Sequence, residues 1–250
     1  MIVIMIDDDY LNYLAGHDPE AWLAMKSAME LDTETKIEPT APAVKRDFNG
    51  FVVYVVDTET TGFDDRLNDV IEISMYRLND DTQKTWCLKP LNNDTIEAGA
   101  LRVNGHKLED LKHETKFGRE TYLAPPKVLI DIENWMMEDG VTSEDRLLIG
   151  QNVSFDKGFL KELWKKCDSA GTFPFGRKMM DTIQIVILMD LAKGVKRKGY
   201  TLGSLADDFG VKKEKAHRAD ADTRMTKELW LKQIAFFQEL LKDVKIPGID

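Results

Sequence analysis

The sequence predicts an α/β domain in which a mixed β-sheet is flanked by helices. Three strand-like segments follow one another between residues 51 and 88, and helical patterns then alternate with a short apolar strand over residues 125–241. The chain has 250 residues, of which 43% are apolar and 31% charged, as in ordinary globular proteins with a full hydrophobic core.

The strands and helices can be assigned in chain order. The unbroken apolar run from Phe51 to Val56 predicts a strand that is buried on both faces. Val70 to Leu78 and Thr82 to Leu88 predict two more strands, separated by an acidic turn. The later elements are a helix over Pro125 to Glu138, a strand over Leu147 to Gly150, a helix after Asn152, a helix over Thr182 to Lys193 and a long helix after His217.

Two carboxylates stand at the end of the first predicted strand. Asp57 and Glu59 are two residues apart, and because strand side chains alternate, both are expected on the same side of the sheet. One cation could bridge them there. Short acidic motifs after a strand are also common as solvated turns or helix caps, so this pair gains meaning only from acids elsewhere.

A third acid stands at the start of a helical pattern. Asp156 precedes Phe159 and Leu160 by three and four residues, so it is expected to face the core with them. Asn152 or Ser154 can cap this helix. The plainer alternative is that Asp156 only complements the helix dipole, but an acid that faces inward needs a partner.

The last helical pattern supplies a histidine and a fourth acid. Five residues separate His217 from Asp222, which would turn them apart within one helix, so His217 is expected on the loop that enters it. Asp222 precedes Met225 and Leu229 by three and seven residues and therefore shares their buried face. Asp220 is better placed for the exposed face.

In order and spacing, these four acids and the histidine resemble the catalytic set of the DEDDh (DnaQ-like) 3′ to 5′ exonucleases. The match runs from about Phe51 to Trp230 and includes Asp181-Thr182 and the segment from Tyr200 to Leu205. The resemblance implies an RNase H-like fold with a mixed five-stranded sheet. Gln151 departs from the pattern, because the family often has His at this position.

The resemblance also implies the chemistry. Asp57, Glu59, Asp156 and Asp222 would bind two divalent cations, Mg²⁺ or Mn²⁺, and His217 would act as the general base. Hard divalent ions prefer oxygen ligands, and two such ions would cancel the charge of four carboxylates. The expected reaction is hydrolysis of phosphodiester bonds at a 3′ end, with release of nucleoside 5′-monophosphates.

The charge balance limits how the chain can bind nucleic acid. It carries 34 Lys and Arg against 44 Asp and Glu, a formal net charge of -10, whereas general nucleic-acid coating proteins are usually basic. An exonuclease that grips only the last nucleotides of a single strand or frayed end has less need of a basic surface. Two basic runs remain candidates for phosphate contacts, Lys193 to Lys198 and Lys212 to Lys215, although such runs are often solvated loops.

Six residues are candidates for contact with the substrate. Phe63 and Phe155 lie close to the acids in the sequence and could stack on bases. The family segment that matches Leu101 to His106 lies near the nucleotide, which implies contacts from Asn104 and His106. Thr58 and Asn152 belong to the acidic motifs themselves.

The chain is expected to divide into an N-terminal appendage with a linker, residues 1–48, and a DEDDh exonuclease domain, residues 49–245. The appendage could pack on this domain, pair two chains into a homodimer, or dock a replication or repair partner. Met1 to Ile6 is too short for a signal or a membrane span, so no membrane partner is expected. Cys87 and Cys167 are isolated, which favours a reduced, cytoplasmic location.

Alternatives remain open at the level of sequence. DNA is favoured over RNA, but an exoribonuclease or oligoribonuclease would use the same site, and a contact to the 2′-OH would decide. A non-catalytic module that binds a 3′ end or a protein is disfavoured because all five site positions are present. Asp57 to Thr60 also loosely resembles a phosphatase nucleophile motif, which would leave His217 unexplained.

Overall fold

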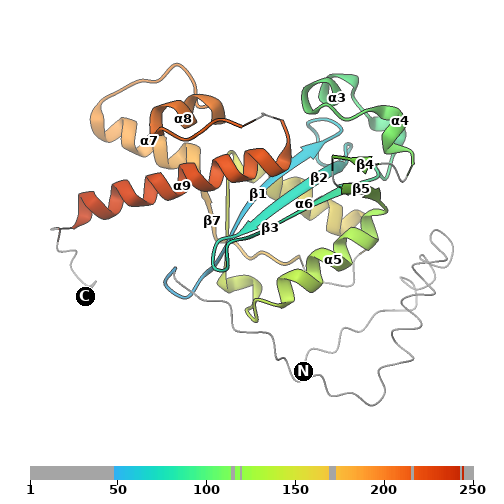
Figure 1. Cartoon of the computed structure of the whole chain (residues 1–250), viewed down its shortest axis with the longest axis horizontal. Coiled ribbons are helices and arrows are strands. Elements are labelled where there is room, and N and C mark those ends of the chain that lie inside the picture. Colours follow the sequence, from blue (N-terminus) through green and yellow to red (C-terminus); the bar gives the residue numbers. More distant parts are fainter. Residues whose placement is uncertain are drawn as a thin grey trace, which may run out of the picture.

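The computed structural model of the protein describes residues 48–113, 116–118, 120–168, 173–214, 217–242 and 244 (Figure 1). Apart from Phe48, the predicted appendage lies outside these residues, so the division into 1–48 and 49–245 stays a prediction. Over the described ranges, no helix is both long enough and apolar enough to cross a membrane.

Seven strands form one mixed sheet in the described part of the chain, in the order β4-β5-β3-β2-β1-β6-β7. The central strand β1 pairs antiparallel with β2 and parallel with β6, which confirms the predicted α/β class with a mixed sheet. The sheet is wider than the five strands predicted, because the hairpin of β4 and β5 joins it at the edge of β3. The strands are β1 (Val52–Thr60), β2 (Val70–Arg77), β3 (Thr82–Leu88), β4 (Lys116–Phe117), β5 (Glu120–Leu123), β6 (Arg146–Gly150) and β7 (Met179–Asp181).

Helices cover both faces of the sheet. Figure 1 shows α9 crossing one face and α5 and α6 on the other, while α3 lies beyond the end of β1. Two short 3-10 turns, Asn93–Thr95 and Ser143–Asp145, connect elements. The α-helices are α3 (Ala98–Asn104), α4 (Leu108–Leu111), α5 (Pro125–Met137), α6 (Val153–Lys166), α7 (Thr182–Lys193), α8 (Leu202–Phe209) and α9 (Ala219–Leu241).

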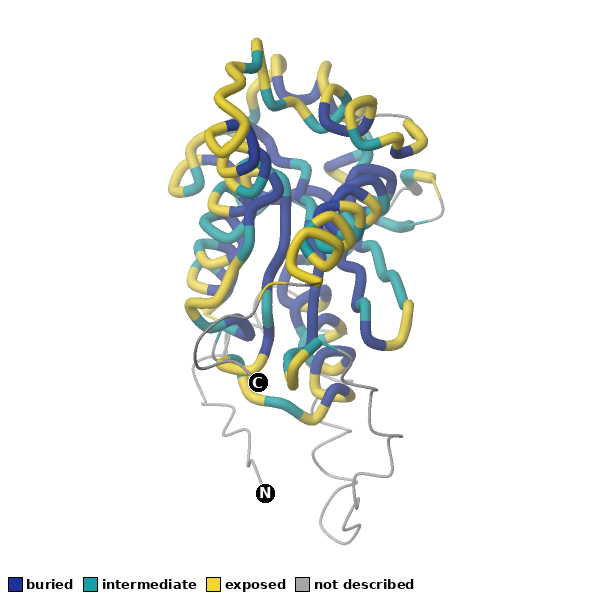
Figure 2. Tube along the Cα trace, turned by 90° about the vertical axis from the view of Figure 1, so that its left-hand side faces the viewer, coloured by how far each residue is buried: buried dark blue, intermediate teal, exposed yellow. Residues whose placement is uncertain are grey.

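The apolar run of β1 is buried on both sides, as predicted. Val52, Tyr54 and Val56 belong to a core that includes residues of α5 and α6, and all three are 0% exposed. Val53 and Val55 face the opposite side, where they share a smaller core with Trp230 of α9. Figure 2 shows the buried strands between outer, more exposed helices. Packing on both faces of the sheet therefore fixes β1, including the C-terminal end that carries Asp57 and Glu59.

The start of α6 differs from the prediction. Asn152 takes the position before the helix with a left-handed φ of 60°, but its side chain makes no capping bond. Instead, the carboxylate of Asp181 accepts hydrogen bonds from the backbone N–H groups of Asn152 and Val153, at 3.1 and 3.2 Å. The same carboxylate caps α7 by accepting from Ile183 N. One acid thus fixes the first turns of two helices.

Candidate active site

Asp57 and Glu59 stand at the end of β1 on the side that faces α9. Strand alternation places them on the same side as Val53 and Val55, whose partner in the core is Trp230. Thr58, between the two acids, points to the opposite side. The predicted common orientation of the two acids therefore follows from a strand that continues to Thr60.

Asp156 comes to the same place from the first turn of α6. It is 3% exposed, which confirms the predicted inward orientation. Its Oδ1 accepts two hydrogen bonds from Thr58, one from the backbone N–H at 2.9 Å and one from the hydroxyl at 2.8 Å. Asp156 is therefore attached directly to the strand segment that carries Asp57 and Glu59.

His217 lies on the loop before α9, as predicted, because that helix begins only at Ala219. Its backbone has a left-handed φ of 60°, and its N–H donates to Asp222 Oδ2 at 2.9 Å. Ligand atoms of His217, Glu59 and Asp222 lie within 4.8 Å of one another. The loop and the first turn of α9 therefore bring a histidine and an acid to the end of β1.

Burial and mutual repulsion raise the pKa of the clustered carboxyl groups. Burial raises the pKa of Glu59 to about 8, and the neighbouring carboxylate of Glu72 makes the next largest contribution. Burial raises the pKa of Asp156 to about 7, although the hydrogen bonds from Thr58 oppose this rise. Burial and then the charge of Asp156 hold the pKa of Asp57 well above its usual range. The positive charge of Arg218 opposes the rise at Glu59.

The donor set suits divalent cations. Asp57, Glu59, Asp156 and Asp222 offer carboxylate oxygens, the ligands that hard cations prefer. Asp222 Oδ1 is buried and has no hydrogen-bond partner among the described residues, and burial raises the pKa of this carboxyl too. A buried acceptor without a partner costs free energy, which a bound cation would recover. These four acids therefore fit the predicted metal site.

The two predicted stacking residues line the same pocket. The pocket has a volume of about 580 Å³. Phe63 is 77% exposed, and Phe155 is half-buried and packs on Phe159 with ring centroids 4.7 Å apart. The complete lining is Phe63, Asp64, Asp65, Arg66, Glu97, Ser154, Phe155 and Phe159. The exposed ring of Phe63 and the half-buried ring of Phe155 offer a surface on which one base could stack.

Three of the six residues predicted to contact the substrate are buried and have partners inside the protein. Asn104 is 3% exposed and donates to Thr60 O at 3.1 Å, so its side chain supports the loop after β1. His106 is also 3% exposed and bonds only inside the protein. The Thr58 hydroxyl is used by Asp156. Asn152 is exposed and its side chain makes no capping bond.

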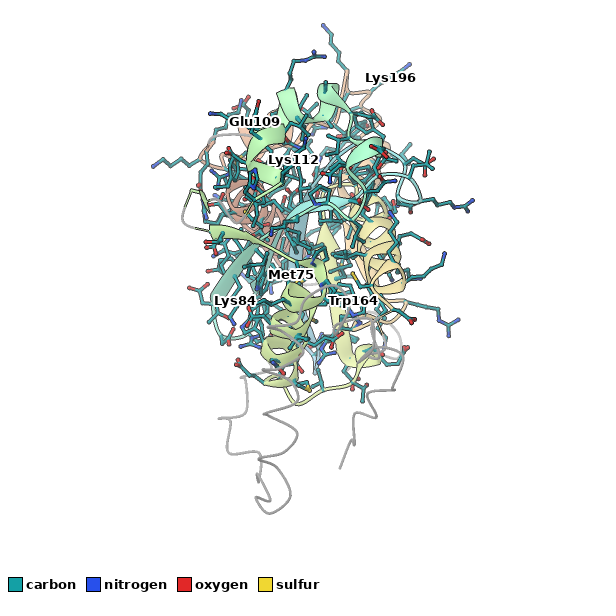
Figure 3. The ribbon with its side chains drawn as sticks, turned by 90° about the vertical axis from the view of Figure 1, so that its right-hand side faces the viewer. Met75, Lys84, Glu109, Lys112, Trp164 and Lys196 are labelled. Atoms are coloured by element: carbon teal, nitrogen blue, oxygen red, sulfur yellow. The ribbon has the colours of Figure 1, made fainter. Side chains whose placement is uncertain are left out.

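The basic runs are only partly available for phosphates. Arg197 is ion-paired with Asp190 and Asp208, and Lys213 with Asp207. Lys196 is exposed, and Figure 3 shows its side chain extending from the body of the protein. Lys215 of the second run lies outside the described residues.

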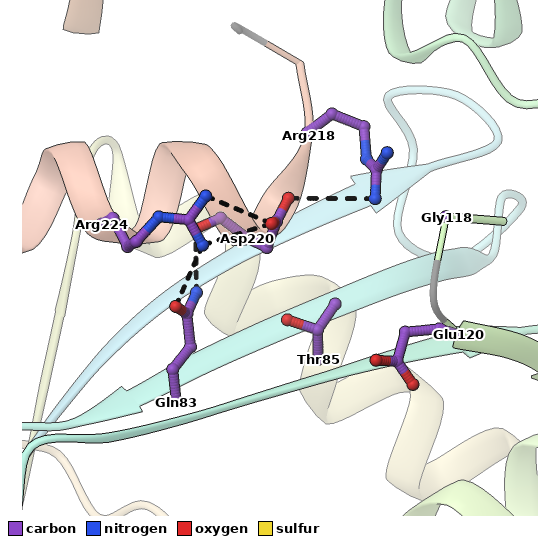
Figure 4. Close-up of a pocket in the computed structure, with 7 residues that line it drawn as sticks. All are labelled: Gln83, Thr85, Gly118, Glu120, Arg218, Asp220 and Arg224. Atoms are coloured by element: carbon purple, nitrogen blue, oxygen red, sulfur yellow. Dashed lines mark hydrogen bonds and ion pairs between the residues drawn. The ribbon is translucent and has the colours of Figure 1, made fainter. Parts of the chain in front are cut away.

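Two residues near the acids have roles that the sequence pattern did not indicate. Glu72 on β2 is the cross-strand partner of Glu59 and is 0% exposed. Arg218, next to His217, reaches Glu72 with an N–O distance of 3.5 Å. Arg218 also lines a second pocket of about 460 Å³, with Gln83, Thr85, Gly118, Glu120, Asp220 and Arg224 (Figure 4). The sequences around Glu59 and Glu72 do not by themselves predict the strand register that pairs these two residues.

Comparisons with known proteins identify relatives of this chain. Ribonuclease T from Haemophilus ducreyi is 23% identical over 207 residues, which cover 79% of this chain and 91% of the relative. The 3′-5′ exonuclease DinG of Staphylococcus haemolyticus is 28% identical over 162 residues, covering 59% of this chain but only 17% of DinG. The zinc-bound complex of Escherichia coli exonuclease I with single-stranded DNA has a TM-score of 0.58 and 17% identity, covering 77% of this chain and 42% of that one.

The exonuclease family model of the RNase T type matches residues 54–230, which is more than half of the chain and contains all four acids and His217. The structural likeness to exonuclease I agrees with the RNase H-like fold expected from the motifs. The chain therefore belongs to the exonuclease family, in the DEDDh (DnaQ-like) group of 3′ to 5′ exonucleases.

Proposed function

We propose that this exonuclease shortens single-stranded or frayed DNA from the 3′ end and releases nucleoside 5′-monophosphates. The observation that carries the proposal is the meeting of acids from three separate segments beside one histidine. The electrostatic coupling of Asp57 to Asp156, Glu59 and Asp222 supports a single shared site.

Asp57, Glu59, Asp156 and Asp222 would hold two divalent cations, Mg²⁺ or Mn²⁺. Bound there, the cations would lower the pKa of a water molecule and stabilise the negative charge that develops on the leaving 3′ oxygen. The protein contributes the fixed positions of the acids: Asp156 is held by Thr58, and Asp222 accepts from the His217 backbone.

His217 would accept the proton from the attacking water. Its side chain is exposed at the edge of the acid cluster, while its backbone N–H bonds to Asp222. An imidazole nitrogen that carries no proton can accept one from water, which is what a general base requires. The left-handed backbone at His217 is uncommon for a residue other than glycine and turns the loop sharply before α9.

Phe63 and Phe155 would hold the terminal base by stacking, which accepts any base. The protein has a net charge of -10, which repels nucleic acid. Base stacking, together with cations that neutralise the four acids, would still allow it to bind the end of a strand. The structural similarity to exonuclease I, which was solved in complex with single-stranded DNA, supports DNA as the substrate.

RNA is the second candidate substrate. Ribonuclease T from Haemophilus ducreyi matches this chain over 91% of its own length. The chain spans only 17% of DinG and 42% of exonuclease I. Cys87 and Cys167 are both free and buried, which supports a reduced, cytosolic compartment for either role.

A time course with 5′-labelled DNA and RNA oligonucleotides of the same sequence tests the proposal. The expected result is a ladder of labelled DNA products that shorten from the unlabelled end with Mg²⁺ or Mn²⁺ and no products with EDTA. If the RNA is shortened faster than the DNA, RNA is the preferred substrate. Product shortening that persists in EDTA, or cleavage from the labelled end, would contradict the proposed reaction.

A further inference from the structure

Arg218 connects the His217 loop to a buried cluster under the sheet edge. Its guanidinium carbon lies 4.3 Å from the ring centre of Phe117, and its terminal nitrogen lies 3.5 Å from Glu72 Oε1. Asp220 is a weaker neighbour at 3.9 Å. The side chain therefore lies over an aromatic ring and reaches a carboxylate on β2.

The partners of Arg218 are themselves fixed. Glu72 and His106 have fully buried side chains, and Glu72 Oε2 lies 3.2 Å from His106 Nε2. The other ring nitrogen of His106 lies 2.5 Å from the Tyr122 hydroxyl. His106 also stacks on Phe117, with ring centroids 3.9 Å apart and planes at 23°. These four residues, called here the Glu72 cluster, come from β2, β4, β5 and the turn after α3.

Arg218 fits this cluster because of the backbone next to Phe117. A Cβ atom at Gly118 would lie 3.1 Å from a terminal nitrogen of Arg218 and 3.6 Å from the other. Gly118 also has a φ of 66°, in the left-handed region that glycine adopts without strain. Figure 4 shows Gly118 and Arg218 among the residues that line the second pocket. The absence of a side chain at Gly118 thus leaves the space that the Arg218 guanidinium occupies.

The same contacts act on the catalytic acids. Glu72 is the cross-strand neighbour of Glu59, so an uncompensated charge on Glu72 disfavours the charged form of Glu59. Arg218 is the positive group that opposes this effect. It is also bonded through the chain to His217, so its contacts hold the backbone next to the proposed base.

We propose that Arg218 is a positioning residue that holds the His217 imidazole over the acid cluster by anchoring its loop to the Glu72 cluster. The proposal rests on the proposed role of His217 as general base. Arg218 touches no substrate atom in it and acts only through its neighbour. A planar guanidinium can stack on Phe117 and face Glu72 at once, whereas a lysine ammonium provides the charge without the flat face.

The test combines two substitutions in the full chain. Arg218→Gln is expected to lower kcat about 10- to 100-fold on a labelled oligonucleotide with KM nearly unchanged, because small displacements of a catalytic group have effects of this size. In a His217→Ala background the same substitution is expected to change kcat less than about twofold, since two residues that act as one unit are not additive. Arg218→Lys should recover only part of kcat.

Lys227 provides the matched control. It also extends from α9 to β2, where its ammonium group lies 3.0 Å from the Tyr76 hydroxyl, and its ion pairs join Asp81 and Glu228. Lys227→Gln should leave kcat at the wild-type value. If Arg218→Gln does not fold, Phe117→Leu removes the stacking surface and keeps every charge, and it should lower kcat in the same His217-dependent way.

The outcomes separate this inference from the proposed function. An unchanged kcat in Arg218→Gln, or an equal loss with and without His217, would overturn the positioning role while leaving the general base intact. A fully active His217→Ala protein would overturn the general base and the positioning role together. Mn²⁺ should still stabilise the Arg218→Gln variant in thermal melts, because all four acids remain.

Discussion

Thr58 donates two hydrogen bonds to a single carboxylate oxygen of Asp156, from its backbone at 2.9 Å and from its hydroxyl at 2.8 Å. The two residues are 98 positions apart and belong to the end of β1 and the first turn of α6. Both bonds favour the charged carboxylate and oppose the effect of burial on its pKa. Thr58 therefore keeps Asp156 in a form and orientation suited to a cation.

Thr58→Val should weaken both folding and metal binding. The change removes the hydroxyl with little change in shape, and the free energy of unfolding should fall by about 1 to 3 kcal/mol, as expected for a lost bond to a charged group. Half-maximal activity should need a higher Mn²⁺ concentration. Thr82→Val is the control, because its hydroxyl also bonds an aspartate, Asp80, but on the exposed hairpin. An unchanged Mn²⁺ requirement would contradict this role.

Local periodicity was sufficient to predict the orientation of the acids. The spacing of Asp156 to Phe159 and Leu160 predicts an inward side chain, and all three are buried in α6. The spacing of His217 to Asp222 predicts a loop followed by a helix, and α9 begins between them. These predictions hold because a helix face and a strand face are properties of the segment itself.

The remaining features depend on pairing between distant segments. The register that sets Glu59 beside Glu72 requires the turn between β1 and β2, and the bonds of Asp181 to the start of α6 join residues 29 positions apart. β4 has only two residues, too few for any periodicity. The burial of His106 likewise follows from the hairpin that packs on it, and it could not be inferred from its own segment.

His217→Ala should remove catalysis but not metal binding. Loss of a general base typically lowers the rate by about 10² to 10⁴, so kcat should fall within this range. Stabilisation by Mn²⁺ in thermal melts should persist, because the four carboxylates remain. His113→Ala, at an exposed position outside the acid cluster, should be fully active. Wild-type kcat in the His217 variant would exclude this residue as the base.

Asp222→Asn should abolish the stabilisation by Mn²⁺. The change keeps the shape of the side chain but removes the charge of an acid whose Oδ1 has no partner among the described residues. Thermal melts with Mn²⁺ and with EDTA should then nearly superimpose. Asp220→Asn, on the same turn of α9 and paired with Arg224, should keep the wild-type difference between the two melts. Equal metal responses in the two variants would argue against Asp222 as a ligand.

The stability of the metal-free protein should fall as the pH rises. The pKa values of Glu59 and Asp156 are raised to about 8 and about 7, above the value of about 4 expected in the unfolded chain. Between about pH 4 and pH 8 the folded state therefore holds more protons than the unfolded state, and deprotonation destabilises it.

Melts in EDTA at about pH 5 and about pH 8 test this effect, with the lower melting temperature expected at the higher pH. Added Mn²⁺ should stabilise the protein more at the higher pH, where fewer protons compete for the carboxylates. A metal-free protein that is more stable near pH 8 than near pH 5 would contradict the raised pKa values.

Phe63→Ala should weaken substrate binding more than turnover. Loss of a stacking ring typically costs about 1 to 3 kcal/mol per base, so KM for a short oligonucleotide should rise several-fold or more. Leu67→Ala is the control, since Leu67 is 60% exposed on the same loop but does not line the pocket. Steady-state kinetics on both variants provide the comparison, and similar KM values in the two would exclude Phe63 as a base platform.

The most direct test of the account is a crystal of the protein soaked in Mn²⁺, with anomalous scattering used to locate the ions. Two manganese peaks are expected within coordinating distance of Asp57, Glu59, Asp156 and Asp222. Peaks at other sites only, or no peak between β1 and the starts of α6 and α9, would contradict it.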